Sequence, residues 1–140
     1  MKLTKYDRVF SQLVRERANW ECEVCHKQFP EGTRQGLDTS HFFSRRRNST
    51  RLHPSNAASM CRGCHQHMGD NPIIFSRWIE KHLGPNLGYI TRLAHKTMRK
   101  SKTYKEEEYL HLKKELERMR KLRAEGETGR ISFDAYGDDL

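Results

Sequence analysis

The stretch that decides the fold carries two Cys-x-x-Cys elements, Cys22-Glu-Val-Cys25 and Cys61-Arg-Gly-Cys64, which contain all four cysteines of the chain. Two such elements let tight turns bring four thiolates around one zinc ion. The alternative is a pair of disulfides, but the chain is strongly basic and starts without an apolar signal stretch, so we expect no export to an oxidising compartment. The sequence therefore predicts a structural Zn²⁺ held by these cysteines.

The segment between the two cysteine pairs is longer than a simple zinc ribbon requires. Ribbons usually separate their pairs by roughly 15–20 residues. The stretch from Cys25 to Cys61 is about twice that length. An insertion of this size on a metal-stabilised scaffold offers room for a second site, so we expect the residues between the pairs to carry the chemistry.

Length and composition predict one small domain that depends on its zinc. The chain has 140 residues, of which 34% are hydrophobic and 32% are charged, so its apolar core must be limited. Binding of a structural zinc contributes on the order of 10 kcal/mol to the folding of small peptides. A zinc site can therefore order a segment that is too polar to collapse alone.

The charge balance predicts a polyanionic partner. The formal net charge is +9 at pH 7, and each phosphate that a basic side chain neutralises releases condensed counterions. We expect this partner to be DNA, contacted mainly through its backbone phosphates; the alternative is a basic but inert surface. A membrane partner is not expected, because the sequence has neither a long apolar run nor a strongly amphipathic basic helix with exposed aromatic residues.

Local patterns predict a strand and a short helix between the cysteine pairs. Residues 36–43 contain the Thr and aromatic side chains typical of a strand, which would direct Asp38 and His41 to opposite faces. The Pro54-Ser-Asn segment indicates the start of a short helix that carries residues 57–60 into the second pair. The strand, the short helix and the two cysteine pairs would then share one small core.

The remaining sections are predicted to be mostly helical. The first helix starts at a capping box of Thr4 and Asp7, and the last is long and polar, so that it either folds onto the body or forms a homodimer with a second chain. Asn71 and Pro72 predict the start of a helix that ends at Gly84. The sections are an N-terminal helix (1–20), a zinc-stabilised core (21–85), a helical extension (86–126, with helices at 87–100 and 103–126) and an acidic, weakly ordered tail (127–140), where Ile131 and Phe133 are candidate docking residues.

The order of the residues around the cysteine pairs resembles the HNH endonucleases. A strand ending in a histidine, a turn, an asparagine and a helix that begins with a metal ligand are the parts of a ββα-metal nuclease. Over residues 20–84 the chain is most similar to the zinc-bearing NinG/Rap recombination nucleases of lambdoid phages. The resemblance implies an α+β fold, a small zinc-stabilised ββα-metal (HNH) module with flanking helices and a long C-terminal helix. It is carried by Asp38, His41, Asn56, Cys61, Cys64, His65, Asn71 and Trp78.

The resemblance also implies a role for each residue of the insertion. His41 is the candidate general base, because a neutral imidazole with an ordinary pKa of about 6.5 can take a proton from water. Asp38 and His65 are the candidate ligands of a catalytic divalent cation, Mg²⁺ or Mn²⁺. Asn56 would tie the hairpin loop to the backbone and so orient the base.

Some positions depart from the family pattern. Many HNH proteins carry the acidic ligand immediately before the histidine, where this chain has Ser40, so Asp38 needs a bulge or a different strand register to reach the metal. His65 stands where NinG-like proteins usually have asparagine, although histidine is the common HNH residue at that place. His67 is an alternative ligand, and Asn71 is either a helix cap or a site residue.

A group of arginines follows the candidate base in the turn after the strand: Arg45, Arg46, Arg47 and Arg51. In a ββα-metal fold this loop lies beside the scissile backbone, so we expect their guanidinium groups to pair with DNA phosphates. The alternative is a solvated run of charge. No element of the sequence indicates reading of base edges, so binding should follow the shape of the DNA backbone.

These expectations describe a metal-dependent DNA endonuclease that hydrolyses phosphodiester bonds. The resemblance implies action on branched or junction DNA in phage recombination or repair, in the cytoplasm of a phage-infected or prophage-bearing bacterial host. Two alternatives stay open. One is a non-catalytic zinc-finger DNA-binding module, and the other is a sequence-preferring homing or restriction-type HNH nuclease.

Overall fold

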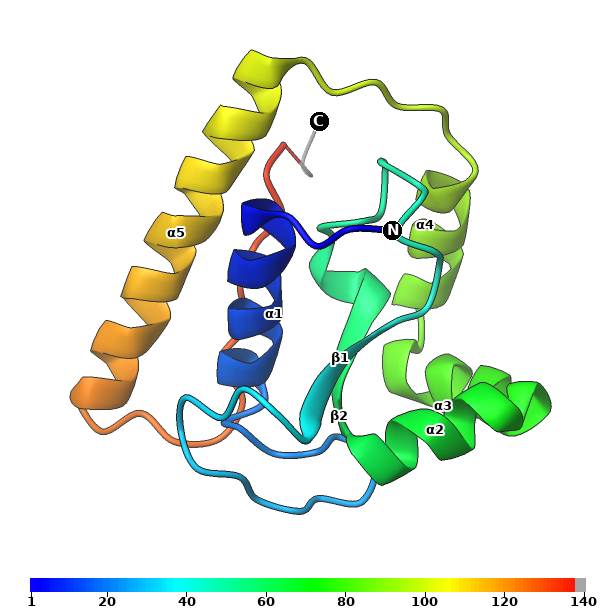
Figure 1. Ribbon diagram of the computed structural model, residues 1–140, viewed down its shortest axis with the longest axis vertical. Coiled ribbons are helices and arrows are strands. Elements are labelled where there is room, and N and C mark those ends of the chain that lie inside the picture. The colour runs from blue at the N-terminus through cyan, green and yellow to red at the C-terminus, as the bar shows by residue number, and fades with distance from the viewer. Residues whose placement is uncertain (138–140) are drawn as a thin grey trace.

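The computed structural model describes residues 1–137 and has an α+β fold (Figure 1). Within these residues, five α-helices surround a two-stranded antiparallel hairpin. The hairpin lies between α1 and α5 on one side and α2, α3 and α4 on the other. The elements are α1 (Lys5–Arg17), β1 (Leu37–His41), the short 3₁₀ helix η1 (Pro54–Asn56), β2 (Ala57–Cys61), α2 (Arg62–Asp70), α3 (Pro72–Leu83), α4 (Asn86–Ala94) and α5 (Lys102–Ala124).

Helix α1 begins at the predicted capping box. The Thr4 amide donates to Asp7 Oδ2 at 2.9 Å, and the Asp7 amide donates to Thr4 Oγ1 at 3.3 Å, so two of the amides at the helix start are satisfied. The apolar side chains recur at helical spacing and face inward. They form one side of the main core: Val9, Phe10, Leu13 and Val14.

Helix α5 folds back along α1 and closes this core (Figure 1). Its buried side chains Leu112, Leu116 and Met119 belong to the same apolar cluster as the inner face of α1. The helix starts slightly earlier than expected, because the Ser101 side chain accepts from the Tyr104 amide at 3.0 Å. Its apolar stripe is covered by the chain itself, and a homodimer through α5 stays a prediction.

The segment after α5 is docked over much of its length. Residues 127–137 form no helix or strand, yet Ile131 and Phe133 are buried in the core between α1 and α5. The Ile131 amide donates to the Arg17 carbonyl at 3.2 Å, and the Arg17 guanidinium lies over the Phe133 ring at 5.2 Å. The expected docking of Ile131 and Phe133 is therefore confirmed. Weak order of the tail stays a prediction, and residues 138–140 of that tail lie outside the described part.

The segment 57–60 is a strand, and the prediction of a short helix there is wrong. After η1, the chain enters β2, which pairs with β1 in a register that runs from Leu37 opposite Cys61 to His41 opposite Ala57. Residues 57–60 are all buried, and a short apolar run of this kind has no periodicity that separates a strand from a helix. Pairing with β1 decides, because it satisfies backbone groups that would otherwise be buried alone.

Helices α2 to α4 form the other side of the molecule. Helix α3 begins after Asn71 with Pro72, as predicted, and ends at Gly84, whose φ of 53° belongs to the left-handed region that favours glycine. Helix α4 ends at Ala94, well before the expected residue 100. No helix in residues 1–137 is long and apolar enough to span a membrane.

Candidate functional site

The four cysteines meet at one point, as predicted. Their sulfur atoms all lie within 4.8 Å of one another, and the Cys25 and Cys61 sulfurs are 3.8 Å apart. A tetrahedral zinc site with Zn–S bonds of about 2.3 Å places its sulfurs about 3.8 Å from one another, whereas a disulfide needs about 2.05 Å. All four cysteines are free thiols. The donor set and its spacing fit a structural zinc ion and do not fit disulfides.

Each cysteine pair has the local geometry of a metal-binding turn. The Cys25 amide points to Cys22 Sγ at 3.5 Å, and the Cys64 amide points to Cys61 Sγ at 3.4 Å. Burial of Cys22 opposes ionisation, but backbone amide groups aimed at its sulfur outweigh that effect and lower the pKa of the thiol to about 7. Amides directed at sulfur favour the thiolate form, which is the form that binds zinc.

The cysteine pairs fasten the ends of the hairpin. Cys61 is both the last residue of β2 and the N-cap of α2. The first pair follows Trp20 and packs on Leu37 and Met60 of the hairpin in a small apolar cluster. Glu23, within the first pair, holds the free edge of β2, because its amide donates to the Ser59 carbonyl and its carboxylate accepts from the Ser59 amide. The zinc site thereby fixes where β1 and α2 lie.

Asp38 of β1 and His65 of α2 lie together beside this zinc site. Asp38 Oδ2 is 3.1 Å from His65 Nδ1. Arg62, at the start of α2, also contacts Asp38, with Nε 3.3 Å from Oδ2 and Nη2 3.4 Å from Oδ1. Partial burial opposes ionisation of Asp38, but the hydrogen bond from His65 and the ion pair with Arg62 outweigh it, so the pKa of the carboxyl lies below its ordinary value.

The contact between Asp38 and His65 forms without a bulge. Strand β1 pairs with β2 residue by residue, so the bulge that was one of the two expected routes from Asp38 to the metal is absent. Asp38 reaches His65 because α2 begins directly at the end of β2, opposite the start of β1. Asp38 and His41 leave opposite faces of the strand, about 10 Å apart along it.

His41 is placed at the end of β1 with one ring nitrogen engaged. Its Nε2 lies 3.2 Å from the carbonyl oxygen of Arg51, and the centroids of its ring and the Phe10 ring are 5.7 Å apart. A carbonyl can only accept, so the neutral ring carries its proton on Nε2, and Nδ1 keeps a lone pair. Burial is the main influence on His41 and lowers the pKa of the ring below its ordinary value.

Asn56 joins the two ends of the loop between the strands. Its Oδ1 accepts from the Phe43 amide at 2.7 Å, while its Nδ2 donates to the Phe43 carbonyl at 3.1 Å and to the Thr50 carbonyl at 3.0 Å. The side chain is fully buried and all these bonds go to backbone groups. Asn56 therefore fixes the loop from which the Arg51 carbonyl meets His41.

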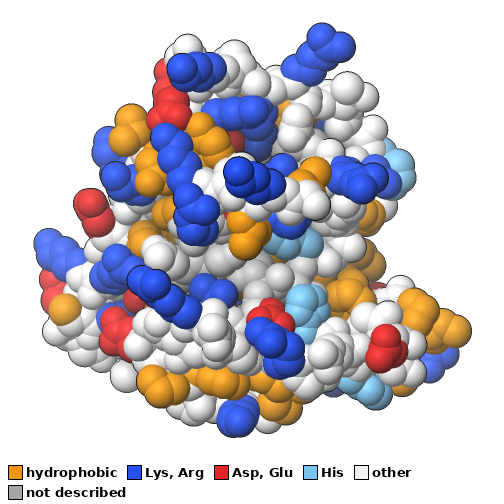
Figure 2. Space-filling view, in the orientation of Figure 1, with side chains coloured by type: hydrophobic (Ala, Val, Ile, Leu, Met, Phe, Trp, Pro, Cys, Tyr) orange, Lys and Arg blue, Asp and Glu red, His pale blue; other side chains and the backbone are white. Residues whose placement is uncertain are grey.

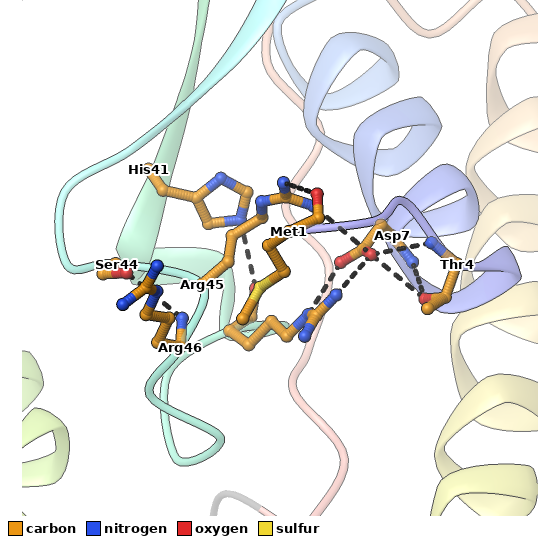
Figure 3. A network of polar contacts seen from close by, with 8 residues as sticks. Met1, Thr4, Asp7, His41, Ser44, Arg45 and Arg46 are labelled. Carbon is orange, nitrogen blue, oxygen red and sulfur yellow. Dashed lines mark hydrogen bonds and ion pairs between the residues drawn. The ribbon is translucent and has the colours of Figure 1, made fainter.

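Two of the four arginines in this loop form ion pairs with the buried Asp7 carboxylate. Arg51 donates to both oxygens of Asp7, from Nε to Oδ1 at 2.9 Å and from Nη2 to Oδ2 at 2.6 Å. Arg45 Nη1 lies 3.5 Å from Asp7 Oδ2, and its Nη2 donates to the Met1 carbonyl at 3.0 Å (Figure 3). The buried carboxylate of α1 thus neutralises charge that the sequence assigned to DNA.

The other two arginines differ from each other. Arg47 donates to the Ala94 carbonyl at 2.9 Å and so ties the loop to the end of α4. Arg46 is exposed and has no acidic partner within residues 1–137. Figure 2 shows Lys and Arg side chains spread over the upper half of this face, with histidine side chains near its centre and few acidic groups among them.

Asp7 is the site residue that sequence reasoning missed. The sequence around Asp7 predicts a capping box, and the structure confirms it. Nothing local signals its second role, because Arg51 lies 44 positions away in the chain. The ring of His67, the alternative ligand, lies beside Asn71, whose Nδ2 is 3.4 Å from His67 Nδ1 and donates to the His67 carbonyl at 2.8 Å.

Comparisons with known protein families, with curated proteins and with solved structures give no match to this chain. Its function must therefore be inferred from the residues themselves. They form a four-cysteine cluster that fits zinc, an adjacent carboxylate and imidazole, and a half-buried histidine with one ring nitrogen available.

Proposed function

We propose that this protein is a metal-dependent DNA endonuclease of the ββα-metal (HNH) type that acts on branched or junction DNA. The observation that carries the proposal is the meeting of Asp38 and His65 at 3.1 Å across the strand and the helix that the zinc site joins. A carboxylate and an imidazole held together on a rigid frame, beside a strand that ends in a histidine, are the parts that such a nuclease needs. The similarity to NinG/Rap nucleases supports the same conclusion.

His41 acts as the general base. The Arg51 carbonyl fixes its tautomer, and burial keeps the ring neutral at pH 7 by lowering its pKa. Nδ1 then takes a proton from a water molecule that attacks the phosphorus. Asn56 holds the loop that presents the Arg51 carbonyl, so its contribution is to position the base.

Asp38 and His65 hold a hard divalent cation, Mg²⁺ or Mn²⁺. When bound, such a cation stabilises negative charge on the phosphate and on the leaving 3′-oxygen. The lowered pKa of Asp38 keeps its carboxylate ionised, as a ligand must be. His65 Nδ1 faces Asp38 Oδ2 at 3.1 Å, so a cation held by both residues would take the place of this hydrogen bond.

The DNA backbone crosses the basic face of the molecule. Arg46 is the loop arginine whose guanidinium is available to a phosphate, whereas Arg45, Arg47 and Arg51 shape the loop. The sequence carries no motif that indicates reading of base edges. Recognition by backbone shape favours a substrate defined by its branch rather than by its sequence.

A non-catalytic DNA-binding module is the second candidate. Arg62 already pairs with Asp38, and this arrangement neutralises the carboxylate without any cation. In that case Asp38, Arg62 and His65 would form a structural cluster that helps α2 to start beside β1. DNA would then bind to the basic face without being cut.

Cleavage assays separate the two candidates. The wild type is incubated with Mg²⁺ or Mn²⁺ and a panel of duplex, single-stranded, flap and four-way-junction DNA. We expect cleavage of branched DNA and a loss of about 100-fold or more in His41→Ala, because the base is removed. Glu117→Ala, at an exposed position of α5, is the control and should cut like the wild type.

The pH profile and the metal requirement sharpen this test. The lowered pKa of His41 predicts a rate that falls only below pH 6.5, as the base becomes protonated. Asp38→Asn should raise the Mg²⁺ concentration needed for half-maximal rate. If the wild type binds every substrate and cuts none with either cation, the binding module is correct.

A further inference from the structure

A cavity of about 360 Å³ lies beside the arginine-rich loop and outside the site described above. Its walls come from the end of that loop, from α4, from the connection between α4 and α5, from the start of α5 and from residues 135–137. Figure 1 shows these segments in the upper part of the molecule, where the connection passes from α4 to α5. A space of this size can enclose one nucleotide-sized group.

Tyrosine rings line this cavity. Tyr104 of α5 and Tyr136 of the C-terminal segment meet edge to face with ring centroids 5.1 Å apart, and Tyr89 of α4 lies on another wall. Partial burial raises the pKa of Tyr104, and its ring is half-buried. Flat aromatic side chains at the wall of a cavity are suited to stacking against a planar base, whichever base it is.

Basic groups stand at the same cavity. Arg92 of α4 and Lys96, just after the end of α4, line the cavity and are exposed. Neither forms an ion pair within residues 1–137. Lys100 also lines the cavity, but it is matched by Glu108, with Nζ 3.0 Å from Oε1. Among the lining residues within 1–137, the unmatched charge is therefore cationic, which suits a phosphate attached to the stacked group.

The cavity is joined to the proposed nuclease site by the loop between the strands. Ser49 and Leu52 of this loop line the cavity, and the carbonyl of neighbouring Arg51 contacts His41. The loop is fastened to the cavity wall because Arg47 donates to the Ala94 carbonyl at 2.9 Å and Asn48 donates to the Met98 carbonyl at 3.3 Å. A DNA strand held in the cavity would thus lie at a fixed position relative to His41.

We propose that this cavity receives one unpaired nucleotide of the DNA substrate, with its base against Tyr104 and its phosphate between Arg92 and Lys96. The inference rests on the proposed function and gives it a source of structure selectivity. Duplex DNA keeps its bases paired and stacked and presents none to the cavity. A flap or junction offers an unpaired nucleotide at its branch, where the cost of unstacking is smallest.

Binding measurements test this site without requiring cleavage. Fluorescence anisotropy is measured with end-labelled flap and blunt duplex DNA in the absence of added divalent cation, so that no strand is cut and the structural zinc is retained. Tyr104→Leu should weaken flap binding about tenfold, the size typical of losing one base–aromatic stack, and should leave duplex binding unchanged. Tyr104→Phe keeps the ring and should bind the flap like the wild type.

Two double variants, each of which removes two positive charges, test the phosphate contact. Arg92→Gln with Lys96→Gln should reduce flap affinity more than duplex affinity, whereas Lys114→Gln with Arg120→Gln, exposed on α5, should change both equally and slightly. Thermal unfolding of each variant shows whether it is folded.

The outcomes separate this inference from the proposed function. Selective loss of flap binding in Tyr104→Leu supports the cavity site even if the wild type cuts no DNA. Cleavage of branched DNA by a wild type whose flap affinity is unaffected by Tyr104→Leu overturns the cavity site and leaves the nuclease intact. An equal loss for flap and duplex also overturns it, because the cavity would then act only through its charge.

Discussion

The two halves of the molecule are stabilised by different means. In the half built from α1, α5 and residues 127–137, a continuous apolar cluster of fully or nearly fully buried side chains forms the core. In the half built from the cysteine pairs, α2 and α3, the buried cluster is small, and α3 has no buried residue at all. The first half can be held by burial of apolar surface, whereas the second buries little of it, so we expect it to need the zinc ion that its four thiolates fit.

This difference explains why the candidate site lies where it does. The hairpin belongs to both halves, because Ala57 joins the large core and Ala58 and Met60 join the small one. His41 and Asp38 leave this shared hairpin on opposite faces, one toward α1 and the other toward α2. The geometry between the candidate base and the candidate ligands therefore depends on how firmly both halves hold the same strand.

Removal of zinc should have the largest effect and should affect one half first. Both tryptophans of the chain, Trp20 and Trp78, contact the small cluster, whereas Tyr6 and Tyr109 pair at 5.7 Å in the other half. We expect a strong chelator to remove folding free energy on the order of 10 kcal/mol and to shift tryptophan fluorescence toward that of exposed indole. Far-UV circular dichroism should keep the part that α1 and α5 contribute.

Restoration of the signal by Zn²⁺ but not by Mg²⁺ is the control for zinc removal. Cys61→Ser should reproduce the effect, because it removes a ligand from the junction of β2 and α2. Unchanged tryptophan fluorescence after complete loss of zinc would show that the small cluster is stable without metal, and the contrast between the halves would be false.

Truncation of a buried side chain in the large core should have the next largest effect. Leu112 is fully buried on α5, while Leu110 on the same helix is 54% exposed. Leu112→Ala should lower the free energy of unfolding by about 2–5 kcal/mol, and Leu110→Ala should change it little. Denaturant unfolding measures both. Zinc content should stay at the wild-type level in each variant, since loss of zinc from Leu112→Ala would mean that the two halves are not separately stabilised.

Loss of the buried carboxylate of α1 should have a smaller effect that depends on pH. Burial opposes ionisation of Asp7, but its hydrogen bonds from Arg51 and Thr4 outweigh it and lower the pKa from 3.8 to about 2. A lowered pKa stabilises the fold above the ordinary pKa, and this contribution is lost as the pH falls from about 4 to about 2. Asp7→Asn should therefore cost about 2 kcal/mol at pH 7.

The free energy of unfolding, measured with denaturant for the wild type and for Asp7→Asn at each pH, gives a difference that depends on this carboxylate and not on the other acids. It should shrink as the pH is lowered toward 2, when Asp7 is protonated in the wild type as well. Asp70→Asn, at the exposed end of α2, is the matched control. A difference that stays constant from pH 7 to pH 2 would show that the ion pair with Arg51 contributes nothing.

The parts of the fold that follow from local chemistry are the ones that the sequence predicts well. The capping box at Thr4 and Asp7 and the helix start at Pro72 are confirmed, because both depend on residues within one turn. The clustering of the four cysteines is also confirmed, since the short spacing inside each pair leaves few alternatives. The prediction for residues 57–60 is wrong because their strand exists only through pairing with β1, some 20 residues earlier.

By itself, the sequence determined the ligands of the zinc site, the first helix and the residues that are candidates for chemistry. Only the tertiary structure decided that Asp7 engages Arg51 and Arg45, that Ile131 and Phe133 close the core, and that Asp38 meets His65 along a regular strand. The reason is physical. Spacing within one turn is fixed by backbone geometry, whereas contacts between distant residues depend on which surfaces the whole chain can bury together.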